Sequence, residues 1–105
     1  MINIQNYQCV RFLEREFGGE YFNPMHKPLW VYVTVCHDPH KIDWSFRLNG
    51  RPENEAVTIF KIAEGKWSIK FTVPPSANYQ LNFESKKTDP IGYYSWEEYE
   101  NEPVF

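Results

Sequence analysis

The densest group of chemically capable side chains in this sequence is the pentapeptide CHDPH, which holds Cys36, His37, Asp38 and His40. Thiolate, imidazole and carboxylate groups are ligands for transition metals, and a thiolate beside a histidine can act as a nucleophile with its base. Pro39 indicates a tight turn, however, and a turn directs its side chains apart instead of converging them on one ion. Cys36 and His37 are neighbours at the end of a predicted strand, so they point to opposite faces. We therefore expect neither a metal site nor thiol catalysis at this motif.

Other sequence signatures of catalysis are missing. The chain contains no G-x-S-x-G, no H-E-x-x-H and no glycine-rich phosphate loop. Cys9 falls on the apolar side of a predicted helix, and a buried free thiol is the simpler interpretation. The paired acids Glu97 and Glu98 lie in a run of acids, which is typical of a solvated face and not of two glycosidase carboxylates. We expect a protein that is not an enzyme and that needs no cofactor.

The closing segment YYSWEEYENEPVF combines aromatic rings with carboxylates. Residues 89–105 hold five acids and no base, whereas residues 1–88 hold nine Asp/Glu and eleven Lys/Arg, so the acidity that gives the chain its net charge of −3 is concentrated at this end. Carboxylates steer a basic partner, and Tyr and Trp supply anchors at low entropic cost. The residues that we expect to bind a partner are Tyr94, Trp96, Glu97, Glu98, Tyr99, Glu100 and Glu102.

These features predict a non-catalytic binding protein, most simply a small intracellular inhibitor or immunity-type protein that blocks a basic functional surface of a protein target. The acidic end would repel nucleic acid, and no apolar run approaches the roughly 20 residues that span a bilayer, so we expect neither nucleic acid nor membrane as a partner. A structural alternative for the same segment is an edge strand formed by Tyr93, Tyr94 and Trp96. Tyr99, Val104 and Phe105 would then cover the open end of the core, and the glutamates would face outward.

A second function is suggested by the stretch EGKWSIKFTVPPSANYQLNF, residues 64–83. It resembles the late strands of immunoglobulin-like starch- and glycogen-binding modules, in which a G-x-W strand and a proline turn precede another hydrophobic strand. The resemblance implies a carbohydrate-binding β-sheet module. Independently of it, the strand pattern leaves Trp30 and Trp96 among the exposed-looking rings that could stack on sugars. SWEEYENE stands where some of those modules have an asparagine-rich ending that grips the sugar, and no binding residue is carried over.

The first element that must position these residues is predicted as a helix over residues 6–17. Asn6 can cap it, and Val10, Leu13 and Phe17 follow helical spacing. The pair Gly18-Gly19 would end it, because glycine adopts the left-handed cap conformation without strain.

From Trp30 onward the apolar period changes to two, which predicts strands. The strands are expected at residues 30–36, 42–49, 56–62, 66–73 and 79–84, with a short last one at 91–96. Alternation breaks at Ile59-Phe60, which predicts a bulge or a strand covered on both sides. The connections are too short for crossover helices, so the strands should be antiparallel. The predicted fold class is α+β, with the N-terminal helix packed on a curled antiparallel meander of five to six strands. The alternative is a small β-sandwich or half-barrel with a helical lid.

Size and composition indicate one domain over residues 1–105. Aromatic residues make up 18%, too many for a disordered chain. The first residues have neither a basic start nor a long apolar stretch, so we expect no signal peptide and, if Met1 is native, a cytoplasmic protein. A module excised from a secreted parent would have the same composition. An uncovered sheet edge could pair with a second copy, so a homodimer is possible.

Overall fold

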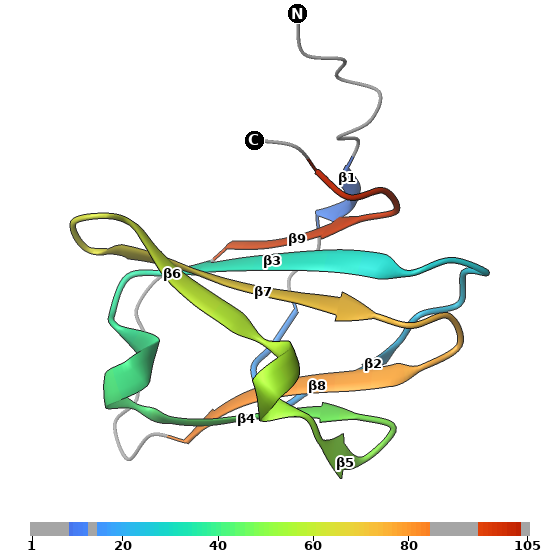
Figure 1. Cartoon of the computed structure of the whole chain (residues 1–105), viewed down its shortest axis with the longest axis horizontal. Helices are drawn as coiled ribbons and strands as arrows, with labels where there is room; N and C mark the ends of the chain where they lie inside the picture. The colour runs from blue at the N-terminus through green and yellow to red at the C-terminus, as the bar shows by residue number, and fades with distance from the viewer. Residues whose placement is uncertain (1–8, 13–14, 85–94, 104–105) are drawn as a thin grey trace, which may run out of the picture.

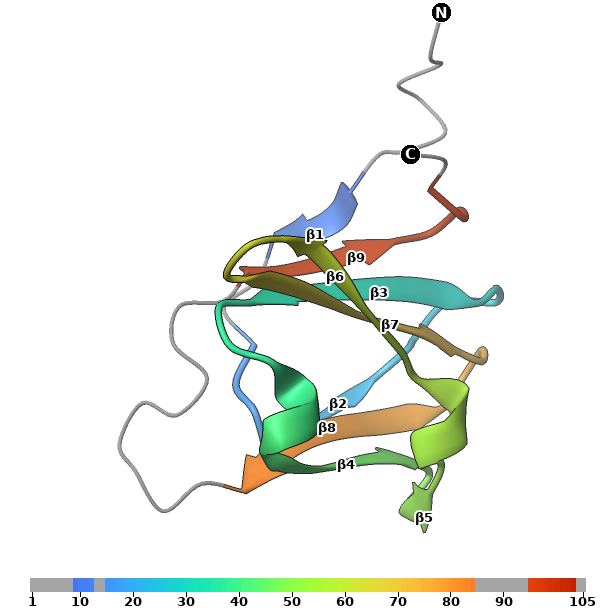
Figure 2. The same ribbon diagram turned by 60° about the vertical axis from the view of Figure 1, so that its left-hand side comes forward.

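The chain forms two antiparallel sheets that face each other in the computed structural model, which describes residues 9–12, 15–84 and 95–103 (Figures 1 and 2). One sheet has five strands in the order β1-β9-β3-β7-β6, and the other has four in the order β2-β8-β4-β5. The strands are β1 (Cys9–Phe12), β2 (Glu20–Phe22), β3 (Leu29–Val35), β4 (Asp43–Leu48), β5 (Arg51–Pro52), β6 (Thr58–Ala63), β7 (Lys66–Val73), β8 (Asn78–Glu84) and β9 (Ser95–Tyr99), and two 3-10 turns are η2 (Pro39–Lys41) and η3 (Asn54–Ala56). Among these residues, no helix has the length and apolar character needed to cross a bilayer.

The predicted N-terminal helix is wrong. Residues 9–12 form β1, which pairs antiparallel with β9 and places Cys9 opposite Tyr99. Residues 15–17 are irregular, while residues 6–8 and 13–14 of the predicted helix lie outside the described residues. Helical spacing of a few apolar residues is a weak local preference, and here the backbone hydrogen bonds offered by β9 outweigh it.

The predicted meander is also wrong, so the α+β fold class is replaced by an all-β arrangement. The chain changes sheet after β1, β2, β3, β5, β7 and β8, so most strands that are consecutive in sequence lie in different layers. A meander in a single sheet would leave its apolar face uncovered, whereas two sheets cover each other. The helical lid of the alternative fold is absent too, since helical structure in the described residues is limited to the two three-residue 3-10 turns.

The individual strands lie close to their predicted positions. β3, β4, β7 and β8 begin and end within one residue of the predicted bounds, and β6 is displaced toward the C-terminus by one to two residues. The predicted bulge is displaced. Ile59 and Phe60 pair in regular register with Ile69 and Ser68, and the register between β6 and β7 shifts at Lys61 and Ala63 instead. β6 is not covered on both sides, however, because Phe60 is 43% exposed and Ile62 is 53% exposed. β9 begins at Ser95, and residues 91–94 of the last predicted strand lie outside the described residues.

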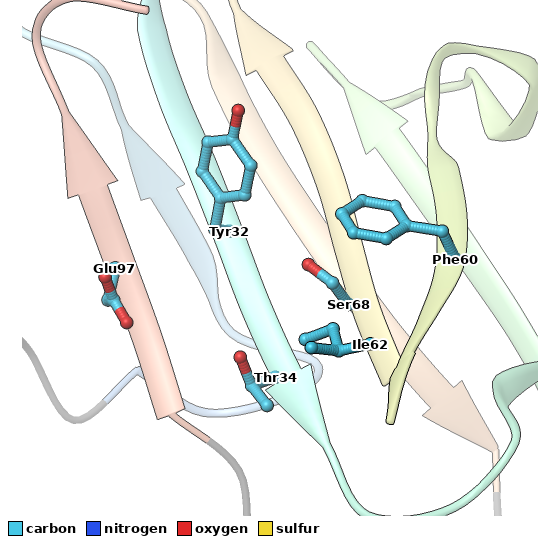
Figure 3. Close-up of a pocket in the computed structure, with 6 residues that line it drawn as sticks. All are labelled: Tyr32, Thr34, Phe60, Ile62, Ser68 and Glu97. Atoms are coloured by element: carbon cyan, nitrogen blue, oxygen red, sulfur yellow. The ribbon is translucent and has the colours of Figure 1, made fainter. Parts of the chain in front are cut away.

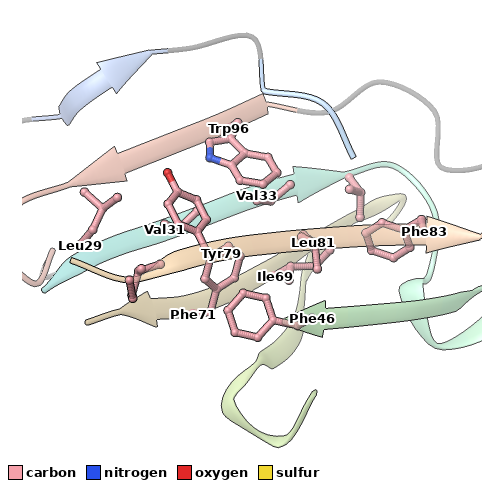
Figure 4. Packing of buried hydrophobic residues seen from close by; sticks show 13 residues of the cluster. Leu29, Val31, Val33, Phe46, Ile69, Phe71, Tyr79, Leu81, Phe83 and Trp96 are labelled. Atoms are coloured by element: carbon pink, nitrogen blue, oxygen red, sulfur yellow. The ribbon is translucent and has the colours of Figure 1, made fainter. Parts of the chain in front are cut away.

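The core lies between the sheets and is built from the predicted inward faces of the strands (Figure 4). Valines of β3 and the alternate residues of β7 meet aromatic and aliphatic side chains of β4 and β8. Phe46 and Phe71 approach across the layers with ring centroids 4.4 Å apart. The buried cluster comprises Leu29, Val31, Val33, Val35, Phe46, Ile69, Phe71, Val73, Ala77, Tyr79, Leu81, Phe83 and Trp96.

A buried asparagine ties two connections together at one end of the sandwich. Asn23 has no exposed surface, and its Nδ2 donates to the carbonyls of Lys27, Val73 and Pro74 at 3.1, 3.2 and 3.1 Å. Its Oδ1 accepts from the Met25 amide at 3.0 Å. The loop before β3 and the turn between β7 and β8 are thereby held by one side chain that satisfies carbonyls in both.

We expect Asn23→Ala to lower the free energy of unfolding by about 2 to 4 kcal/mol, because three carbonyls lose their common donor in a buried site. Urea denaturation followed by tryptophan fluorescence measures the change. Asn101→Ala is the matched control, since Asn101 is exposed, and it should stay within about 0.5 kcal/mol of the wild type. Equal, small effects of the two substitutions would show that the Asn23 hydrogen bonds do not support the fold.

Candidate functional site

Strand alternation divides the predicted partner-binding segment into two faces. In β9, Trp96 lies opposite Val33 and Glu98 opposite Val31, so both point into the core. Glu97 and Tyr99 consequently belong to the outer face of the five-stranded sheet. Residues predicted as one binding surface are therefore split between the interior and the exterior.

The inward-facing Glu98 is a fully buried carboxylate with 0% exposure. Its Oε2 accepts hydrogen bonds from the Tyr79 hydroxyl at 2.5 Å and from the Trp96 indole Nε1 at 2.9 Å. Its Oε1 lies 3.4 Å from Nη2 of Arg15, whose guanidinium also sits 4.1 Å from the centroid of the Tyr21 ring. A buried charge requires such partners, so Glu98 holds the two sheets together.

The side chains of Trp96 and Tyr99 are also buried. Trp96 is 2% exposed, and its ring lies 6.2 Å from Phe71 and 6.3 Å from Phe17. Tyr99 is 6% exposed, donates a short hydrogen bond from its hydroxyl to Glu97 Oε2, and meets the Tyr32 ring edge to face at 5.8 Å. The carbohydrate-binding alternative thus loses one of its two tryptophans, because a ring inside the core cannot stack on a sugar.

The remaining predicted site residues are carboxylates closer to solvent. Glu97 and Glu100 are half-buried and Glu102 is exposed, while Tyr94 lies outside the described residues. Partner binding by these residues stays a prediction. Only these three glutamates, of the residues predicted and described, have side chains that reach the surface.

A groove opens on the outer face of the five-stranded sheet, beside Glu97 (Figure 3). It encloses about 350 Å³ and is lined by Tyr32, Thr34, Phe60, Ile62, Ser68 and Glu97. Phe60 and Ile62 stand on β6 at one side, Glu97 stands on β9 at the other, and the remaining three lie between them on the central strands β3 and β7. The groove is therefore apolar at one side and acidic at the other.

The strand registers explain the hollow. One cross-strand row places Thr34 opposite Ser95 on one side and Ser68 on the other, and Ser68 in turn opposite Phe60. Three small side chains in succession lower the surface beside the large Phe60. The next row places Glu97 opposite Tyr32, and Tyr32 opposite Lys70, so larger side chains border the hollow.

Burial and one carboxylate influence Tyr32, which lies in the middle of this face. Burial, together with the negative charge of Glu102, raises the pKa of the Tyr32 phenol above its ordinary value. Lys70 Nζ lies 5.9 Å from the centroid of the Tyr32 ring. Within the described part of the chain, the carboxylates in ion pairs are Asp38, Glu64 and Glu98, so Glu97 and Glu102 are not neutralised in this way.

Sequence reasoning did not select Phe60, Ile62, Thr34 or Ser68 as site residues. The available signal is the break in alternation at Ile59-Phe60, which predicts either a bulge or a strand covered on both sides. Phe60 and Ile62 are exposed because β6 is the last strand of its sheet, and none of the described segments lies over their outer face. That position depends on the sheet order, which the local pattern does not contain.

The CHDPH motif serves a local structural purpose. The Asp38 carboxylate caps η2 by accepting from the His40 amide at 3.0 Å and lies 2.9 Å from the His40 ring Nδ1. Desolvation acts to raise the pKa of Asp38, but the hydrogen bonds from His40 and the charge of Lys41 outweigh it and lower that pKa. No group of three or more metal-binding side chains surrounds a common point among the residues that the structure describes.

Comparison with known proteins shows no family model, curated protein or solved structure with significant similarity to this chain. The resemblance of residues 64–83 to sugar-binding modules therefore stays a prediction. In the structure, these residues form β7, the following turn and β8, and they contribute mainly to the core. Function is inferred below from the groove and its charges.

We expect Glu98→Ala to lower the free energy of unfolding by about 3 to 5 kcal/mol, because Arg15, Tyr79 and Trp96 lose a common buried acceptor. Urea denaturation measures the loss. Glu102→Ala, which removes the same side chain from an exposed position, should change it by no more than about 0.5 kcal/mol. Similar effects of the two substitutions would contradict a structural role for Glu98.

Replacing Glu102 with Gln should lower the pKa of Tyr32 but leave it above 10.0, because burial persists after the charge is removed. Tyrosine ring ¹³C chemical shifts recorded against pH measure this pKa. Since the folded-state pKa lies above the unfolded one, the contribution of Tyr32 to stability is present below pH 10.0 and is lost as the pH rises through the folded-state pKa. Glu55→Gln, on exposed η3, should leave the Tyr32 titration unchanged. An unaltered titration in Glu102→Gln would place the Glu102 charge away from Tyr32.

Proposed function

We propose that this protein is a non-catalytic binding protein that blocks a basic surface of a protein target, as an intracellular inhibitor or immunity-type protein does. One feature of the molecule carries the proposal: an apolar groove with an acidic border on the outer face of the five-stranded sheet. The large hydrophobic side chains most exposed among the described residues are Phe22, Phe60 and Ile62, and two of these three line the groove. Clustered exposed apolar side chains rimmed by polar groups mark interaction sites.

The charge around the groove supports a basic partner. Glu97 borders it, Glu102 is close enough to affect the pKa of Tyr32, and Glu100 lies between them in the sequence. Residues 89–105 contain five acids and no base. Such a field speeds encounter with a positively charged surface, and the apolar side of the groove on β6 then provides contact area that excludes water.

The structure leads us to revise which residues would make the contact. Three of the predicted residues are buried, namely Trp96, Glu98 and Tyr99. Their side chains hold β9 in place and do not reach a partner. Glu97, Glu100 and Glu102 are retained from the sequence prediction as candidate contacts. Tyr32, Phe60 and Ile62 join them as the apolar part of the proposed interface.

Docking by the sheet face is favoured over pairing through the sheet edge. β6 is an edge strand, but it carries Lys61 and a register shift at Lys61 and Ala63. Charged side chains and bulges on an edge strand oppose the addition of another strand. A homodimer that pairs through the β6 edge is therefore less well supported than a heterologous partner bound to the face.

The proposal predicts that a target protein co-purifies from the source cell with the wild type and is lost when the groove is altered. In the apolar variant Phe60→Ala with Ile62→Ala, affinity for that target should fall about tenfold or more, since buried aromatic and aliphatic anchors dominate such interfaces. Phe22→Ala is the matched control, because Phe22 is 48% exposed on the other sheet and should bind normally.

A charge variant provides the second half of this experiment. Glu97→Gln with Glu102→Gln should slow association and reduce its dependence on salt, whereas Glu16→Gln with Glu20→Gln alters exposed acids elsewhere by the same total charge. Surface plasmon resonance with the purified target at several ionic strengths measures both rates. Binding that is unaffected by the apolar and charge variants of the groove would overturn the proposal.

A further inference from the structure

The size of the groove restricts what can enter it. Its volume of about 350 Å³ lies near the lower end of the range for pockets that hold small ligands. It is also open along the outer face of the sheet, so a side chain presented by another protein has access. The groove suits one long side chain of a partner better than a folded loop or a helix.

The lining combines three kinds of group. Phe60 and Ile62 offer apolar contact, and Tyr32 adds a second aromatic ring (Figure 3). Thr34 and Ser68 contribute hydroxyls on the floor between these side chains, and Glu97 contributes a carboxylate. An anionic group would be repelled by Glu97, while a purely apolar group would remove that carboxylate from water without pairing it. The groove therefore favours an occupant with an apolar stem and a positively charged end.

Among basic side chains, the chemistry favours arginine over lysine. A guanidinium is planar, stacks on aromatic rings and presents several N–H donors in a fixed geometry that matches a carboxylate and neighbouring hydroxyls. An ammonium is more strongly hydrated and presents a point charge, so it gains less from two rings and a hydroxyl floor.

The carboxylate that would receive the guanidinium is already oriented. The Tyr99 hydroxyl donates to Glu97 Oε2, and Tyr99 itself packs against the Tyr32 ring. Fixing the acceptor before binding lowers the entropy lost when a partner arrives. Among the described residues, Lys70 lies beside the Tyr32 ring, while Glu97 stands opposite Tyr32 on β9 and the charge of Glu102 acts on the Tyr32 phenol.

We infer that the groove between β6 and β9 receives an arginine side chain of the target, with the guanidinium against Glu97 and Tyr32 and the apolar stem against Phe60 and Ile62. This inference rests on the proposed function, and it names the chemical group that the target must present. A target with a functional arginine at the centre of its basic surface would be blocked directly.

Nuclear magnetic resonance with three probes tests the inference, namely the Nα-acetyl amides of arginine, lysine and citrulline. Arginine should shift the Ile62 methyl signals and the amide signals of Thr34 and Ser68, and it should bind at least about threefold more tightly than lysine. Citrulline has nearly the same shape without the charge, so it should cause little or no shift. Glu97→Gln should weaken arginine binding about fivefold while keeping an oxygen for the Tyr99 hydrogen bond.

Two control variants separate the groove from the rest of the surface. Phe60→Ala should reduce the arginine shifts, whereas Phe22→Ala and Glu20→Gln should leave them unchanged. Equal binding of citrulline and arginine, or no groove shift up to the solubility limit of the arginine probe, would overturn the inference. If binding of the co-purified target still required Phe60 and Ile62, the proposed function would stand without the arginine inference. If groove variants changed the binding of neither the target nor the probes, the proposed function and the arginine inference would both be contradicted.

Discussion

The buried carboxylate of Glu98 is the constraint on which the arrangement of this protein depends. It accepts hydrogen bonds from Tyr79 of β8 and from Trp96 of its own strand, and it pairs with Arg15 in the segment before β2. One side chain thus joins the five-stranded sheet, the four-stranded sheet and the N-terminal segment. A carboxylate without exposed surface is tolerated only where such partners surround it, so β9 must occupy the register that turns Glu98 inward.

That register also determines what the outer surface carries. Because side chains alternate along a strand, turning Glu98 inward turns Glu97 outward, beside Tyr32 of the adjacent strand. The same face then gains its hollow from the small residues Thr34 and Ser68 and its apolar side from Phe60 and Ile62. The buried ion pair and the acidic side of the proposed binding groove consequently lie on opposite faces of β9. Recognition by the groove would rely on β9, which the buried contacts of Glu98 hold in place.

The mistaken helix and the burial of three predicted site residues share a physical cause. Val10, Leu13 and Phe17 satisfied a helical spacing, but residues 9–12 find hydrogen-bond partners in β9, far along the chain. Trp96, Glu98 and Tyr99 looked like an acidic aromatic surface, yet Glu98 is paired in the core and both rings are buried. In each case the structure depends on contacts with residues far away in the sequence, which a local pattern does not contain. Glu97, Glu100 and Glu102 were identified from sequence as acidic candidates and do reach the surface to differing extents.

The sequence by itself determined where the main strands lie and which face of each is apolar, because a period of two is a local property of successive side chains. It also determined the acidic character of residues 89–105. Only the tertiary structure decided the order of the strands in two sheets, the burial of Glu98 and the exposure of Phe60 and Ile62. The physical reason is that burial and ion pairing depend on which distant strands meet, and two sheets cover each other's apolar faces in a way that no single strand can specify.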